Sequence, residues 1–385
     1  MLEVQVIMNS PSIANSPIVG VLVNRRTLST ILMKQGAPAG LHHLVEMACK
    51  SRVACYIFSL EEIVWPESLV RGCHRDPESG SWTSSLFPLP DVIYDRATYP
   101  EEERPVAKEA RSRLKSINGV KFINSKPYFA KWQTYRVLSS DKATVSCLPE
   151  TILYDGPGSV VSMLEKYASV YVKSNYGSLG QEVIRIQKSA EGGSYWCVFM
   201  KGERFVQKLA AGLDGINKVV REVNPKARFV VQQGIEVCTC DDRPFDIRVL
   251  LQKDGTGEWV VTALVARVAQ AGGAVTNVGA GGAVKYPEDL LVHWFGGRSG
   301  EIVRDIKHLA IQVGSCLDAR YGPSGELGLD VGVDKSGGIW LFEVNSKPAK
   351  STVRALGDRD IIDKAYRLPM EYARYLSGFG RPELL

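Results

Sequence analysis

The sequence predicts a small α/β domain followed by a larger α+β module, and three observations lead to this fold class. In the first third of the chain, β-branched runs alternate with apolar residues at helical spacing, which is typical of a mostly parallel sheet. Later strand-like runs are joined by short turns rich in Gly and Asp, which indicate antiparallel hairpins. The length of 385 residues and the hydrophobic content of 45% suit two or three globular domains.

The charge pattern excludes some functions. Lys and Arg number 47 against 42 for Asp and Glu, and the charges are scattered, which gives little support to nucleic-acid binding. No run approaches the ~18 uncharged apolar residues that cross a bilayer. Residues 1–16 lack the basic and apolar regions of a secretion signal. We therefore expect a cytoplasmic protein that binds neither nucleic acid nor membrane.

The Cys and His residues indicate neither a zinc site nor a catalytic triad. The eight cysteines include no Cys-x-x-Cys pair and no clustered His partners. Cys238 and Cys240 could form a redox pair, but strand alternation also places them on one face as small hydrophobic residues. His42, His43 and His308 are not near a nucleophile motif, so we expect them to be structural or exposed.

The first domain is expected to span residues 1–125 and to contain a mostly parallel sheet. The segment 73–90 is rich in Ser, Pro and Gly, so it is expected to be a loop. The predicted elements are strands at residues 18–23, 52–58 and 91–94 and a helix at residues 41–50.

The second module is expected to span residues 126–385 and to combine helices with antiparallel strands. The predicted final hairpin turns at residues 334–338, which contain Asp, Ser and two Gly. The predicted helices span residues 128–139, 155–167 and 302–321, and the predicted strands span residues 170–173, 183–186, 196–200, 228–232, 246–251, 259–268, 327–333 and 339–344.

A glycine-rich turn with a lysine is a candidate phosphate site. Lys173 ends a predicted strand and is followed by Gly177, Ser178 and Gly180. Glycines let backbone N–H groups approach anionic oxygens, Ser178 adds a hydroxyl donor, and Lys173 adds a positive charge. The pattern is not a P-loop, because its spacing differs and no helix follows. A plain hairpin turn is the alternative interpretation.

The final hairpin carries a candidate Mg²⁺ site. Glu343 and Asn345 share one face of their strand through the period of two, and pairing across the turn brings Asp330 beside them. Mg²⁺ prefers such oxygen ligands and completes its octahedron with phosphates and water. A solvated sheet face is the alternative, but the apolar residues before Glu343 indicate a buried strand, where carboxylates need partners.

Two arginines and a glycine loop complete the candidate residues. Asp246 and Arg248 lie on one predicted strand and Arg267 on the next, where guanidinium groups can offer paired donors to phosphates or form surface ion pairs. Asn277 and Gly281-Gly282 lie in a loop suited to backbone contact with a ligand, although the loop could equally be a plain crossing.

The order of these signals resembles the ATP-grasp superfamily over about residues 126–350. The shared order is a lysine on a helix, a lysine with a glycine loop, Asp-x-Arg, an Asn with paired glycines, and a hairpin with Glu-x-Asn. The strings at residues 243–248, 276–277 and 343–348 look like those of RimK-type ligases. They look most like the YheC/YheD branch, which is associated with endospore-forming bacteria and the spore coat.

This resemblance implies a two-part architecture. Residues 1–125 would be a Rossmann-like pre-ATP-grasp domain, and residues 126–385 would be a two-lobed ATP-grasp module. Within that module, residues from about 160 to 235 would form the lid subdomain.

The resemblance also implies a role for each candidate residue. ATP and Mg²⁺ would be the cofactors. The nucleotide would be held by Lys131 and Lys173 on its α- and β-phosphates, by the lid residues Gly177, Ser178 and Gly180, and by the adenine hinge residues Gln232, Gln233 and Ile235. The metal ligands would be Asp330, Glu343 and Asn345; the transferred phosphoryl group would face Arg248 and Arg267; and the substrates would contact Asp246, Asn277, Gly281, Gly282 and Lys347.

The implied activity is a carboxylate–amine ligase. A carboxylate would attack the γ-phosphate to give an acyl phosphate, and an amine would then displace phosphate to form an amide or peptide bond. This chemistry needs positioning and charge neutralisation and no protein nucleophile, in agreement with the lack of a triad. The implied partners are small-molecule or peptide carboxylates and amines, together with spore coat components.

Two alternatives stay open at this point. Ser174 and Glu182 stand where relatives often carry proline and glycine, and Val278-Gly279-Ala280 replaces a polar or basic pair. These departures favour a spore-associated structural or assembly protein with weak or no turnover. A kinase-like phosphotransferase is the other alternative, because the superfamily also supports phosphoryl transfer without amide formation.

Overall fold

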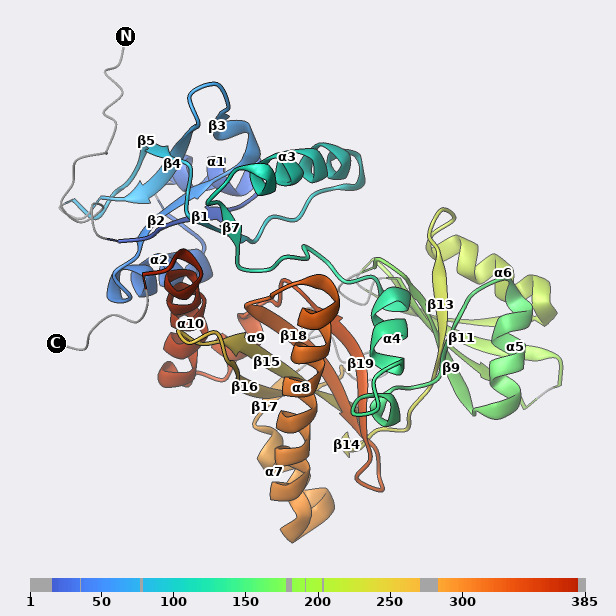
Figure 1. The fold of residues 1–385 in the computed structure, drawn as a ribbon. Helices are drawn as coiled ribbons and strands as arrows, with labels where there is room; N and C mark the ends of the chain where they lie inside the picture. Colours follow the sequence, from blue (N-terminus) through green and yellow to red (C-terminus); the bar gives the residue numbers. More distant parts are fainter. Residues whose placement is uncertain are drawn as a thin grey trace.

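The computed structural model describes residues 16–34, 36–76, 79–177, 182–190, 192–202, 204–270 and 283–379. Within these ranges the strands form three sheets, each covered by helices (Figure 1). The first sheet belongs to the start of the chain, the second forms a separate lobe, and the third lies between them (Figure 1). The expected combination of an α/β domain with an α+β module is confirmed.

The first sheet is parallel at its centre, as the alternation of strands and helices predicts. Its parallel strands lie in the order β2 (Ala54–Phe58), β1 (Ile18–Leu22), β6 (Val92–Asp95) and β7 (Lys121–Phe122). The helices of this domain are α1 (Arg25–Lys34), α2 (Ala39–Lys50) and α3 (Arg104–Ser116). Alternate residues of β1 enter different cores, because Val21 packs in a cluster with residues of α1 and α2 while Leu22 packs in one with Leu114 of α3.

The expected loop at residues 73–90 is wrong. Strands β4 (Leu69–Arg75) and β5 (Trp82–Pro88) form an antiparallel hairpin there, and the short β3 (Ile63–Val64) also pairs with β4. Trp82 and Phe87 are buried in different core clusters, so the hairpin packs on both faces, and the surrounding Ser, Pro and Gly residues conceal this in the sequence. Gly72 lets this hairpin approach the domain, because a Cβ there would lie 2.6 Å from the ring of Tyr56.

The second sheet is antiparallel and has helices on it. Its strands lie in the order β12 (Arg204–Ala211), β11 (Ser194–Lys201), β10 (Val183–Lys188), β9 (Ser169–Ser174), β13 (Phe229–Gln233) and β8 (Thr151–Leu153). Helices α5 (Pro157–Lys166) and α6 (Gly212–Val223) bury their apolar sides against it, and Ile216 and Val220 of α6 share a core with Val172 of β9. β12 and α6 were not predicted.

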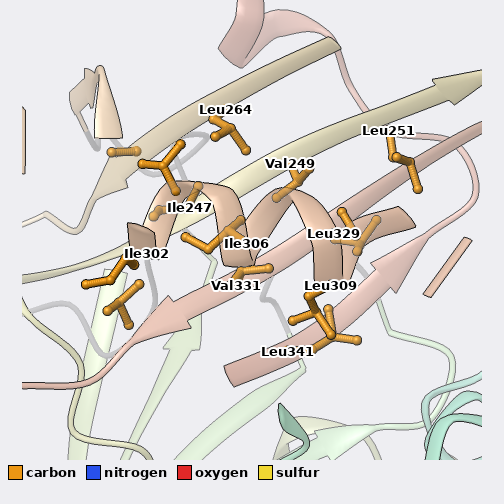
Figure 2. Close-up of a cluster of buried hydrophobic side chains, with 14 of the residues drawn as sticks. Ile247, Val249, Leu251, Leu264, Ile302, Ile306, Leu309, Leu329, Val331 and Leu341 are labelled. Atoms are coloured by element: carbon orange, nitrogen blue, oxygen red, sulfur yellow. The ribbon is translucent and has the colours of Figure 1, made fainter. Parts of the chain in front are cut away.

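The third sheet carries the hairpin that the sequence singles out. Its strands lie in the order β17 (Ala283–Lys285), β16 (Trp259–Val268), β15 (Arg243–Lys253), β18 (Glu326–Val333) and β19 (Ile339–Asn345), and β14 (Thr239–Cys240) pairs with β15. Helix α8 (Ser299–Tyr321) packs on one face, preceded by α7 (Pro287–Phe295). Figure 2 shows Ile306 and Leu309 of α8 among Val249, Leu329 and Leu341 of the strands.

The last helix returns to the first domain. After the short α9 (Ser351–Ala355), α10 (Arg359–Ser377) packs on α2, and its residues Tyr366 and Met370 share a core cluster with Val21 (Figure 1). Pro369 lies inside α10 and cannot donate to the carbonyl of Ala365, which instead accepts from Gln252 Nε2 at 2.8 Å. In the described ranges, we find no helix that is both long and apolar enough to span a membrane.

Candidate active site

A cleft lies where helix α4 (Lys131–Ser139), strands β9 and β13, and strand β19 meet. Its lining combines many apolar residues with a few charged and polar side chains. The apolar lining residues are Phe129, Leu138, Leu148, Val230, Leu341, Phe342 and Val344, and the charged and amide-bearing ones are Lys131, Lys173, Gln232 and Glu343. Such a combination suits a ligand with one flat apolar part and one anionic part.

Among the described residues, Lys173 is one of the two cations that line this cleft. It lies on β9, beside β13, and its Nζ donates to Oε1 of Gln232 at 2.6 Å. The rings of Tyr171 and Phe342 lie 5.4 and 5.7 Å from Nζ. Burial lowers the pKa of Lys173 to about 8, Glu343 opposes this shift and Lys131 adds to it. An anion in the cleft would add to the negative charge that Glu343 already supplies to Lys173.

Lys131 connects three elements. It is the first residue of α4, and its Nζ lies 2.8 Å from the carbonyl oxygen of Gly177 and 3.1 Å from Oε1 of Glu343. The two candidate phosphate lysines thus line the same cleft from different elements, one from α4 and one from β9. At the same time, β9 and β10 on the two sides of the glycine turn pair as an antiparallel hairpin. The phosphate site stays a prediction.

The final hairpin places two candidate metal ligands opposite each other, through a β-bulge that was not predicted. Asp330 of β18 lies opposite Glu343 of β19, and Asn345 lies opposite Gly328. Two carboxylates and one amide oxygen suit Mg²⁺. The described residues contain no group of three His, Cys, Asp or Glu side chains that could hold a metal, so an ion here would also take ligands from a bound nucleotide and water. With that completion, the donor set fits magnesium.

Asp330 is held by two arginines. Its carboxylate accepts from Arg248 at 2.6 and 3.3 Å and lies 3.1 Å from Arg267. Burial alone would raise the pKa of Asp330, but the two arginines outweigh it and keep that pKa below its usual value. Arg267 also forms a two-pronged ion pair with Asp246 at 2.7 and 2.5 Å. Both arginines are therefore engaged by carboxylates of the third sheet.

Comparison with known proteins decides the family. The sequence profile of the YheC/D-like ATP-grasp family matches residues 119–376, which is well over half of the chain. The chain belongs to the YheC/D-like ATP-grasp family. Endospore coat-associated protein YheD of Bacillus subtilis (strain 168) is 25% identical over 376 residues, which cover 97% of this chain and 81% of YheD.

Solved structures share the ATP-grasp fold. The D-cycloserine synthetase DcsG superposes with a TM-score of 0.56 at 13% identity and covers 93% of this chain and 99% of its own. D-alanyl-alanine synthetase A from Vibrio cholerae gives 0.53 at 11% identity and covers 94% and 98%. At these identities the likeness shows the fold alone, and it agrees with the resemblance inferred from the motifs.

In this YheC/D-like chain the hairpin is also tied to the first domain. Nζ of Lys347, just after β19, lies 2.6 Å from Oδ1 of Asp95 and 2.7 Å from the carbonyl oxygen of Ala97. Asp95 also pairs with Arg111 at 2.6 Å. The Lys347 ammonium, which the resemblance places at the substrates, thus lies at the junction of the two domains, beside the end of the first sheet.

A second polar cluster lies behind this junction. Glu326 at the start of β18 is completely buried and accepts from Tyr94 at 2.7 Å, Arg96 at 2.9 Å and Gln252 at 2.6 Å, and it pairs with Lys350. Burial would raise the pKa of Glu326, but Lys350 and Arg96 lower it further than burial raises it. The first domain and the ATP-grasp module therefore share a charged core.

Of the predicted hinge residues, Gln232 lines the cleft, whereas Gln233 and Ile235 are not among its lining residues. Gln232 and Gln233 end β13, and Ile235 follows on the segment that leads to the third sheet. Gln233 donates its N–H to the carbonyl of Glu150 at 2.8 Å and accepts the N–H of Glu150 at its side-chain oxygen at 3.1 Å. Gln232 faces Lys173, so its side chain belongs to the phosphate end of the cleft as well.

Some predicted site residues lie outside the described residues, and some site residues were not predicted. The predicted residues outside the described ranges are Ser178, Gly180, Asn277, Gly281 and Gly282. The apolar wall at Phe342, the tie at Asp95 and the contacts of Asn175 were missed. Phe342 had no local signal, because under the period of two it would face away from Glu343. The β-bulge at this point lets both residues line the cleft. Asp334 was expected to serve the turn, and it accepts the N–H groups of Ser336 and Gly338.

Of the two interpretations of Cys238 and Cys240, the structure favours packing as small hydrophobic residues over a redox pair. Cys238 and Cys240 are both buried in the core of the third sheet, and none of the cysteines forms a disulfide. Burial raises the pKa of Cys238 to about 11, so its reactive thiolate form is disfavoured.

Proposed function

We propose that the chain is an ATP- and Mg²⁺-dependent ligase that joins a carboxylate to an amine through an acyl phosphate. One observation carries this proposal: Lys131 and Lys173 face the Asp330–Glu343 hairpin across a single cleft with an apolar wall. The ATP-grasp fold of the chain and its ligase neighbours agree with an ATP-dependent ligase.

The cationic residues of the site would bind the phosphates, and its carboxylates would bind magnesium. Lys131 and Lys173 would neutralise the α- and β-phosphates, while adenine would lie against Phe342 and the backbone of Gln233. Asp330, Glu343 and Asn345 would hold magnesium, which screens the phosphate charges during transfer. The buried arginines would fix Asp330 in place.

The reaction would run in two displacements. An oxygen of the substrate carboxylate attacks the γ-phosphorus and ADP leaves, which gives an acyl phosphate. The amine then attacks the acyl carbon, loses a proton and expels inorganic phosphate, which leaves an amide. Both steps depend on positioning and charge neutralisation. We propose that the substrates are small molecules or peptides that meet at the domain junction near Lys347, with lid motion of residues 160–235 closing over them.

The test measures ADP release from ATP with pools of amino acids and small peptides. A ligase requires both a carboxylate and an amine, and ¹⁸O placed in the carboxylate must appear in the released phosphate. Glu343→Gln removes a proposed magnesium ligand and should abolish ADP release. A stable phosphorylated product without an amide would instead favour a kinase-like phosphotransferase. Nucleotide binding without ADP release from any pair would contradict the ligase proposal.

A second candidate function has a specific observation in its favour. Glu182, at the end of the glycine loop, lies so close to Gly177 that a Cβ there would be 3.0 Å from its Oε2, and Asn224 holds the same carboxylate at 2.8 Å. A negative charge beside a phosphate loop opposes nucleotide binding. The chain would then act as a spore coat-associated assembly protein. Its relative YheD carries the name endospore coat-associated protein. Under that proposal a Glu343→Ala strain keeps a normal spore coat, whereas a ligase role predicts a defect.

A further inference from the structure

Helix α4 begins without a cap from its own sequence. Its N-cap residue is Ala130, which has no side-chain acceptor, and its first turn contains no acidic residue. The first residue is Lys131, whose positive charge lies at the positive end of the helix dipole. Both features disfavour a well-ordered first turn, yet this turn carries one of the two lysines of the cleft.

Asn175 supplies the missing acceptors from another part of the chain. Its carbonyl oxygen accepts the N–H of Lys131 at 3.0 Å, and its Oδ1 accepts the N–H of Trp132 at 2.8 Å. Asn175 and Trp132 are 43 residues apart in the sequence. The side chain is 5% exposed, so these bonds are shielded from water.

Asn175 is itself fixed on the strand that carries the other lysine. It follows β9 directly, two residues after Lys173, and its N–H donates to the carbonyl of Arg228 at 2.8 Å. Two residues beyond Asn175, the carbonyl of Gly177 accepts from Nζ of Lys131 at 2.8 Å. The segment after β9 therefore holds both the backbone and the ammonium of Lys131.

We infer that Asn175 is a positioning residue that sets the place of Lys131 relative to Lys173 by capping α4. This inference rests on the proposed function, since it assigns the two lysines to one phosphate chain. Asn175 is not among the residues that line the cleft, so it would act through Lys131. Its effect should therefore be specific for phosphates and absent when Lys131 is gone.

The experiment compares ATP and adenosine binding by calorimetry in the full-length chain. Asn175→Ala should weaken ATP binding about fivefold to tenfold, the size of effect expected from one lost helix cap, and leave adenosine binding within about twofold. In a Lys131→Ala background, Asn175→Ala should change ATP affinity by less than about twofold. Gln133→Ala is the matched control, because it removes only the 3.4 Å contact with Asn175 Nδ2.

Amide hydrogen exchange of Trp132 separates this inference from the proposed function. Slow exchange in the wild type that becomes fast in Asn175→Ala supports the cap whether or not nucleotide binds. If Asn175→Ala speeds up the exchange of Trp132 but the wild type binds no ATP, the proposed function fails and the capping role of Asn175 stands. Unchanged exchange in Asn175→Ala, or an equal loss of ATP affinity with and without Lys131, overturns the inference.

Discussion

Lys131 and Glu343 form an ion pair across the cleft, with Nζ 3.1 Å from Oε1. The first belongs to the proposed phosphate site and the second to the proposed metal site. Each charge therefore has a partner before any ligand binds, and the site avoids leaving two partly buried charges uncompensated. Binding of a magnesium nucleotide would replace both partners at once, with phosphate for the lysine and metal for the carboxylate.

This exchange predicts that Glu343→Gln loses the magnesium dependence of ATP binding. In the wild type, ATP should bind more tightly with Mg²⁺ than with EDTA, because the metal bridges phosphates and carboxylates. In the variant the two affinities should converge. Glu236→Gln, in an exposed pair with Lys335, is the control and should behave as the wild type. A magnesium effect that survives in Glu343→Gln would show that the metal binds elsewhere.

The lowered pKa of Lys173 predicts a pH dependence of nucleotide binding. With a pKa of about 8, Lys173 is charged below pH 8 and loses its proton above it. Phosphates favour the charged form, so ATP affinity should be greatest below pH 8 and should fall by up to about tenfold per unit as pH rises above 8. Calorimetry between pH 7 and 9.5, in buffers of different ionisation enthalpy, should detect proton uptake on binding above pH 8.

Lys173→Arg provides the control for this pH effect. Its guanidinium keeps its charge throughout the range, so any remaining binding should not vary with pH. An affinity that stays flat in the wild type, or that falls equally in Lys173→Arg, would assign the titration to another group.

The junction of the two domains predicts a large stability effect at Asp95. This carboxylate is 9% exposed and pairs with both Arg111 and Lys347. Asp95→Asn would leave two cations without their counter-charge, at a cost of about 3 to 5 kcal/mol. Urea unfolding measures this change. Glu222→Gln breaks more exposed pairs with Lys201 and Lys208 and should change stability little. If Asp95→Asn and Glu222→Gln lowered the free energy of unfolding equally, Asp95 would not hold the domain junction through its buried ion pairs.

The return of α10 to the first domain predicts that residues 1–125 do not fold alone. Tyr366 and Met370 of α10 belong to the same core as Val21 of β1. The isolated fragment should lack a cooperative thermal transition, and adding residues 359–377 as a peptide should restore one. Within the full chain, Met370→Ala should cost about 2 to 5 kcal/mol, and Met370→Leu less than about 1.5. A fragment that unfolds cooperatively without the peptide would contradict this packing.

Local patterns in the sequence predict the final hairpin and its turn, but not the β-bulge that places Asp330 opposite Glu343. The turn at Asp334 pairs Val331 with Leu341, and a regular register would then pair Asp330 with Phe342. A β-bulge between Asp330 and Val331 shifts the register, so that Asp330 lies opposite Glu343. Lys173 was found from a local pattern as well, because its strand and glycine turn are adjacent in the sequence. Both features depend on residues that are close along the chain.

Contacts between distant segments were not predictable in this way. The tie between Asp95 and Lys347 joins residues 252 positions apart, and no local pattern marks it. Asn175 follows a strand and caps a helix that ends long before it, so neither segment shows the pairing alone. Pro369 obscures α10, since a proline within a helical pattern normally indicates a break, and the compensation by Gln252 lies on another element.

The most direct test of the central claim is a calorimetric titration of ATP, with and without Mg²⁺, into the wild type, Lys173→Ala and Glu343→Ala. The account predicts magnesium-dependent binding in the wild type, and a loss of that binding in both variants while their thermal unfolding stays cooperative. A folded wild-type chain that binds no nucleotide under either condition would contradict the account.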